Sequence, residues 1–174
     1  MAITSHQEVL TLRPLGHPDR CLSLNNLANA LSTCFNHLGR MEDLEVVITF
    51  HHEALSLWPL GHPDHSLSLN NLADALSTRF EQLGRMEDLE DAITFHHEAL
   101  TLCPVGHQAC AGSLNGLANN LSTHFKQLGR MEDLEEAITF HHEALSVLKA
   151  TQNALVPSTI LPMLFILALT SWAG

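Results

Sequence analysis

The sequence predicts an all-α fold, an α-α superhelix in which helical pairs stack as a solenoid. Three observations predict it: the chain repeats itself every 45 residues, each repeat carries two stretches of helical apolar spacing, and no stretch shows the alternation of a strand. A two-helix unit cannot bury its apolar face alone, so successive units must stack on one another.

Two copied segments define the period. The octet LGRMEDLE recurs at residues 38–45, 83–90 and 128–135, and ITFHHEAL recurs at 48–55, 93–100 and 138–145. Residues 4–16 align with 49–61, so the chain opens midway through a repeat. We therefore expect a partial repeat at 1–15 (second helix only), three helix-turn-helix repeats at 16–60, 61–105 and 106–149, and an apolar tail at 150–174.

The first helix of each repeat is amphipathic. Between Leu24 and Leu38 the apolar residues step by three and four, which places them on one stripe of a helix. Pro18 suits the first turn, and Asp19 complements the positive end of the helix dipole. Gly39 is expected to end the helix.

The second helix is expected from about Met41 to Trp58. Its apolar stripe has the same spacing, and Pro59 ends it. Acidic residues gather in its first turn, where the helix dipole favours them and water solvates them. They are Glu42, Asp43 and Glu45, then Glu87, Asp88, Glu90 and Asp91, then Glu132, Asp133, Glu135 and Glu136. Attraction of a basic partner is the alternative role for these carboxylates.

Composition excludes several classes of protein. The net charge of −11 repels phosphate backbones and leaves no basic stripe, so no nucleic-acid partner is expected. The four cysteines match neither a zinc pattern nor a disulfide framework, and free intracellular thiols are expected. They are Cys21, Cys34, Cys103 and Cys110. The first residues lack a secretory pattern, and the expected location is cytoplasmic.

The residues of the first helix carry a family resemblance. The segment LNNLA at 24–28 and its copy LNNLA at 69–73, followed by Val47, Ala54 and Pro59 in the first copy, resemble tetratricopeptide repeats. The preceding HPD at 17–19 is similar to the kinesin-light-chain-like subtype. The 45-residue unit exceeds the usual length of about 34 residues and resembles tandem arrays of mushroom-forming fungi, often joined to an effector such as a CHAT domain.

That resemblance implies a non-catalytic protein–protein interaction scaffold, in which the first helices line a concave face for an extended peptide or partner. The residues agree, because polar side chains step along the face opposite the core stripe, and asparagine amides suit pairing with a peptide backbone. The candidate partner-binding residues are Asn26, Asn29, Thr33, Asn71, Asp74, Thr78, Asn119 and Thr123. In the third repeat Gly112 and Gly116 replace two side chains of this face.

The triplet His-His-Glu, present in all three repeats, raises the alternative of a metal site or an enzyme. Adjacent helical residues point about 100° apart, whereas a helix that clamps zinc needs histidines four apart. No catalytic triad motif or phosphate loop accompanies them, so no catalytic residue, metal or cofactor is expected. His51, His96 and His141 lie on the apolar stripe and are expected to be half-buried, neutral packing residues.

The tail leaves two alternatives open. Residues 154–173 are twenty uncharged residues, about the thickness of a membrane core, but the uninterrupted apolar stretch covers only residues 160–169. We expect either a capping helix or a weak membrane anchor, the only route to a membrane in this chain. The half-repeat at the start also favours a fragment of a longer multidomain protein whose effector is missing.

Overall fold

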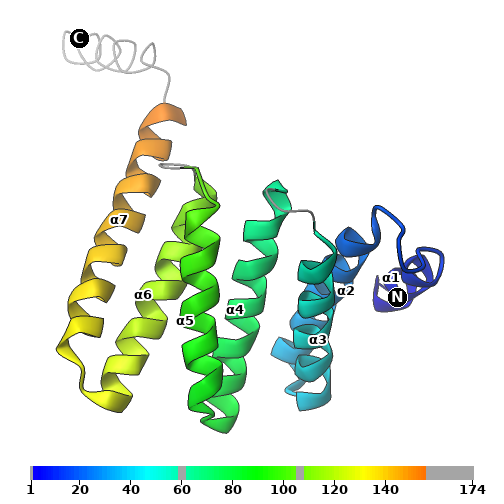
Figure 1. The fold of residues 1–174 in the computed structure, drawn as a ribbon, viewed down its shortest axis with the longest axis horizontal. Coiled ribbons are helices and arrows are strands. Elements are labelled where there is room, and N and C mark those ends of the chain that lie inside the picture. Colours follow the sequence, from blue (N-terminus) through cyan, green and yellow to red (C-terminus); the bar gives the residue numbers. More distant parts are fainter. Residues whose placement is uncertain (1, 59–61, 105–107, 156–174) are drawn as a thin grey trace, which may run out of the picture.

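The computed structural model describes residues 2–58, 62–104 and 108–155. Within those residues the chain forms seven α-helices and no strand. They are α1 (Ala2–Thr11), α2 (Arg20–Leu38), α3 (Met41–Leu57), α4 (Pro63–Leu83), α5 (Met86–Thr101), α6 (Gln108–Leu128) and α7 (Met131–Leu155). Figure 1 shows them side by side, with α1 and α7 at opposite ends.

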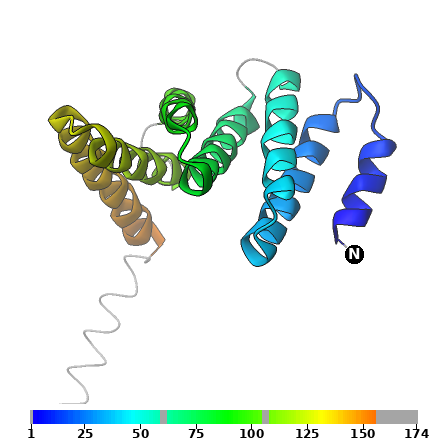
Figure 2. The same cartoon turned by 90° about the horizontal axis from the view of Figure 1, so that it is seen from below.

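The helices form three antiparallel pairs, which confirms the all-α superhelix. Helix α2 packs on α3, α4 on α5 and α6 on α7, and each pair then contacts the next pair along the chain, in the order that Figure 2 shows from below. Hydrogen bonds connect α2 to α4 and α4 to α6, whereas ring contacts connect α3 to α5 and α5 to α7. The first helices thus line one side of the stack and the second helices the other.

Glycines end the first helices as the sequence predicts. Gly39 and Gly84 both adopt φ of 67°, a left-handed conformation, and each donates its amide to a phenylalanine carbonyl four residues earlier. The start of α2 differs from the prediction, because Pro18 lies outside the helix, which begins at Arg20. Pro63, its copy, does occupy the first turn of α4.

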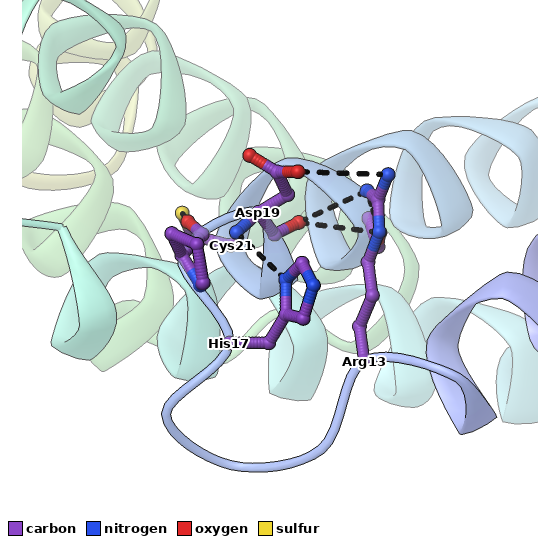
Figure 3. A network of polar contacts seen from close by, with 6 residues as sticks. Arg13, His17, Asp19 and Cys21 are labelled. Atoms are coloured by element: carbon purple, nitrogen blue, oxygen red, sulfur yellow. Dashed lines mark hydrogen bonds and ion pairs between the residues drawn. The ribbon is translucent and has the colours of Figure 1, made fainter.

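Arg13 holds the turn before α2. Its guanidinium donates to the Asp19 carbonyl at 3.2 Å and to the Ser23 hydroxyl at 2.7 Å, as Figure 3 shows for the contact with Asp19. The Nδ1 atom of His17 accepts the Asp19 amide at 3.1 Å. These bonds fix Asp19 in front of the helix, where its own side chain makes no capping bond.

Arg13 has a different equivalent residue in each later copy of the repeat. Each of these residues links neighbouring elements by a different kind of contact. Forty-five residues later the Trp58 indole donates to the Ser68 hydroxyl at 2.9 Å. In the next copy Cys103 forms a disulfide with Cys110, across the turn between α5 and α6, with 5.8 Å between the Cα atoms. The prediction of four free thiols is therefore wrong for this pair, because the end of α5 and the start of α6 come close and bring together two cysteines whose spacing matches no disulfide pattern.

The first-turn carboxylates do not all remain in water. Asp43 pairs with Arg40, but Asp88 is only 4% exposed and binds Arg79 through both carboxylate oxygens at 2.9 and 2.6 Å. The prediction of a solvated carboxylate is therefore wrong for Asp88. The reason is a change on the facing helix, where Arg79 stands in place of Cys34, its equivalent one repeat earlier.

The three stripe histidines also differ from their prediction. His51 and His96 are 2% and 0% exposed, deeper than half-buried, whereas His141 is exposed. Ile48 and its copy Ile138 show the same contrast, at 5% and 51% exposed. The reason is position in the stack, because α7 has no later helix against it in the described part of the chain.

The predictions for the tail fall largely outside the described residues, which end at 155. Helix α7 itself continues past residue 149, the expected end of the third repeat. In the described stretches no helix is long and apolar enough to cross a membrane.

Candidate functional site

The predicted inner face contains a polar hollow of about 270 Å³ between α2 and α4, which we call the α2–α4 hollow. Its lining residues are Asn29, Ser32, Asn36, His51, Asn71, Asp74, Ala75 and Thr78. Four of the eight candidate residues lie here: Asn29, Asn71, Asp74 and Thr78. Asn26 and Thr33 are exposed on α2, and Asn119 and Thr123 lie on α6 without lining this hollow.

Two asparagines connect the repeats across the hollow. The Asn71 amide group donates to the Asn29 carbonyl oxygen at 3.4 Å. Within the described residues this long bond leaves the amino group of Asn29 and the carbonyl oxygen of Asn71 as further donor and acceptor. The pair therefore offers a peptide backbone both kinds of hydrogen bond that it needs.

The candidate threonines contribute less than the asparagines. The Thr33, Thr78 and Thr123 hydroxyls each donate to the carbonyl four residues earlier in the same helix, at 3.0, 2.8 and 2.9 Å. Each hydroxyl proton is thus used inside its own helix, and the oxygen remains as an acceptor for a ligand.

Sequence reasoning missed four lining residues: Ser32, Asn36, His51 and Ala75. Asn36 could have been found, because it continues the step from Asn29 to Thr33 along the same helical face. His51 comes from α3 beneath the hollow, and only the packing of α3 under α2 and α4 shows that it reaches this surface.

His51 forms part of the floor as a neutral imidazole. Burial, with a smaller contribution from the neighbouring His52, lowers the pKa of His51 to about 4. Its Nδ1 lies 2.9 Å from the Asn25 carbonyl oxygen, while the Asn25 amide donates to Ser68. Because that oxygen can only accept, Nδ1 carries the proton and Nε2 is an acceptor.

The second histidine of the first two triplets has a packing role. His52 meets the edge of Phe95, and His97 meets Phe140, each on the second helix of the next repeat. In the described residues no group of three His, Cys, Asp or Glu side chains could hold a metal ion.

Gly116 lies directly against a histidine side chain of the preceding repeat. A Cβ atom at Gly116 would lie 2.5 Å from Cε1 and Nε2 of His96, which is fully buried. Gly112, one turn earlier on α6, has nothing within 4 Å of such an atom. The glycine at 116 therefore admits the His96 ring, where the earlier repeats carry asparagine.

We expect Gly116→Ala to destabilise the fold by about 1–3 kcal/mol, because the new methyl group and the imidazole need the same space. Gly112→Ala is the matched control and should stabilise by roughly 0.5–1 kcal/mol, since alanine suits the interior of a helix better than glycine. Urea unfolding of both variants measures the difference. Equal stabilisation by the two substitutions would contradict the contact with His96.

A larger hollow of about 540 Å³ lies at the loop end of the same repeats. His17 and His62, from the two copies of His-Pro-Asp, line it, and each accepts the amide of the aspartate two residues later. Trp58 stacks on His62 with 4.1 Å between ring centres. These bonds serve the turns before α2 and α4, and none of the predicted site residues lies here.

Comparison with known proteins supports the fold of this site. Residues 21–65 match a family model described as Tetratricopeptide repeat. No curated protein matches the chain. The matched stretch covers nearly all of α2, the whole of α3 and the first residues of α4, and the α4 side of the α2–α4 hollow lies beyond it. Tetratricopeptide repeats generally mediate protein–protein interactions and are typically non-catalytic, and residues 21–65 of this chain are similar to such a repeat.

Proposed function

We propose that the inner face formed by α2, α4 and α6 binds an extended peptide of a protein partner, and that the chain is a scaffold without catalytic activity. The observation that carries the proposal is the α2–α4 hollow, where amides from two successive repeats, Asn29 and Asn71, meet beside open space. The eight predicted residues, including Asn26, Asn119 and Thr123, form the proposed surface, and the partner that it binds is a protein or peptide rather than a nucleic acid.

An extended ligand suits this geometry. Solenoid repeats place equivalent side chains at regular intervals along one surface, so each repeat can contact a successive part of the same peptide. The asparagine side chains replace the water that the peptide backbone loses on docking. We also propose that the repeats are of the kinesin-light-chain-like subtype and that the protein is cytoplasmic.

The double substitution Asn29→Ala with Asn71→Ala should weaken binding by about 1–3 kcal/mol for each hydrogen bond removed, because the partner's polar groups stay buried and unpaired. Peptides selected from a random phage library on the wild-type chain serve as the probe, with affinity measured by calorimetry. Helical circular dichroism and the unfolding midpoint of the variant show whether the fold survives.

The matched control replaces exposed acids of the outer helices, Glu42→Ala with Glu90→Ala. Glu45 is unsuitable as a control, because its carboxylate binds Arg79 at 2.8 Å. The proposal expects the control to retain wild-type affinity. Loss of affinity in the acid variant, with retention in the asparagine variant, would move the binding surface to the acidic edge of the outer helices.

A further inference from the structure

The inner face carries a carboxylate at its centre. Asp74 on α4 occupies the position that is Asn29 on α2 and Asn119 on α6. Its side chain is 60% exposed, and its Oδ2 atom accepts from the Asn70 amide at 3.1 Å. One oxygen of the carboxylate is thus oriented by its own helix, at a point where the other repeats present a neutral amide.

No cation neutralises this carboxylate in the described part of the chain. Arg79, on the next turn of α4, is bound to Glu45 and Asp88. The closest basic group is His96, whose Nε2 lies 3.6 Å from Oδ1 of Asp74, too far for a hydrogen bond. Desolvation by the surrounding walls raises the pKa of Asp74 to about 6, although solvent reaches it from the open side.

His96 gives a second, independent observation at the same place. Its ring is 0% exposed, and neither ring nitrogen has a hydrogen-bond partner. Burial, followed by the nearby His97, lowers its pKa to about 4, so the ring is neutral at pH 7 and cannot balance the carboxylate. A buried unpaired imidazole thus faces a partly desolvated carboxylate that opens into the α2–α4 hollow.

We propose that Asp74 receives a basic side chain, lysine or arginine, of the peptide bound along the inner face. The inference rests on the proposed function and adds a specificity to it. Asn29 and Asn71 hold the peptide backbone, and Asp74 selects a cation at the neighbouring position. The net charge of −11 attracts a basic segment to this surface.

A cation fits Asp74 better than a backbone amide does. An ionised carboxylate only accepts hydrogen bonds, and an ammonium or guanidinium group both donates to it and neutralises its charge. The asparagines of the other repeats already supply groups for a neutral backbone. The substitution of one amide by a carboxylate therefore changes what the central position recognises.

The matched variant is Asp74→Asn, which gives α4 the residue that α2 and α6 carry at this position. Random-peptide phage selection on the full wild-type chain should enrich lysine and arginine. For a selected peptide, replacing its lysine with norleucine should weaken binding to the wild type by about tenfold or more, since the charge pair is removed. Binding to Asp74→Asn should be nearly the same for the lysine and norleucine peptides.

A charge-matched variant separates position from net charge. Asp74→Asn with Asn119→Asp keeps the total charge but moves the carboxylate to the next repeat, and it should not restore the preference for lysine on peptides selected by the wild type. A preserved preference in this variant would overturn the inference in favour of general charge attraction.

Two further outcomes distinguish this inference from the proposed function. Selected peptides without basic enrichment, or with equal affinity for the wild type after norleucine replacement, would overturn the role of Asp74 while leaving peptide binding intact. This peptide comparison needs no protein variant. Failure of the wild type to select any peptide would instead overturn the proposed function and the inference with it.

Discussion

Replacing Arg79 with alanine is expected to destabilise the protein by about 3–5 kcal/mol, because the substitution leaves a buried carboxylate without its partner. Arg79 binds both oxygens of Asp88, whose side chain is 6% exposed, and it also reaches Glu45 of the preceding repeat at 2.8 Å. The same side chain therefore connects two repeats. Urea unfolding followed by circular dichroism measures the change in the free energy of unfolding.

The matched control is Arg40→Ala, which removes the partner of Asp43, the copy of Asp88 in the preceding repeat. Arg40 is 57% exposed, so this surface pair should contribute no more than about 1 kcal/mol. Adding Asp88→Asn to Arg79→Ala should recover part of the loss, since the variant no longer buries a charge. Equal effects of the two arginine substitutions would show that water solvates Asp88 after all.

Stability should fall as the solution is acidified from pH 7.5 to 5. His51 and His96 have pKa values of about 4 in the fold, against 6.5 without burial. In the unfolded chain these two imidazoles therefore bind protons below pH 6.5, whereas in the folded chain they remain neutral down to about pH 4. Stability is lost across that window. By pH 5 the loss amounts to roughly 2 kcal/mol for each histidine.

The chain supplies its own control for this dependence. The variant His51→Gln with His96→Gln should flatten the pH profile of thermal unfolding, whereas His141→Gln should leave it unchanged, because His141 is exposed. The raised pKa of Asp74 acts in the opposite direction below pH 6. It is present in both variants, so it cancels in the comparison. An identical acid slope in the two variants would refute the role of the buried rings.

The sequence alone determined the architecture of this protein. The 45-residue period, the steps of three and four, and Gly39 and Gly84 at the helix ends depend on each helix and its immediate neighbours in the chain. The same spacing placed polar residues on the inner face, and four of the eight candidates line the α2–α4 hollow. Local periodicity could predict these features because each helix supplies its own geometry.

Tertiary structure decided what identical segments do in different repeats. His96 is buried and His141 exposed within the same ITFHHEAL, because among the described helices only the former lies under a following repeat. Asp88 is buried by Arg79, and Cys103 meets Cys110 across a turn. Burial and pairing depend on residues far along the chain or on an adjacent helix. The sequence of one repeat does not specify which residues pack against it, so these features could not be predicted from it.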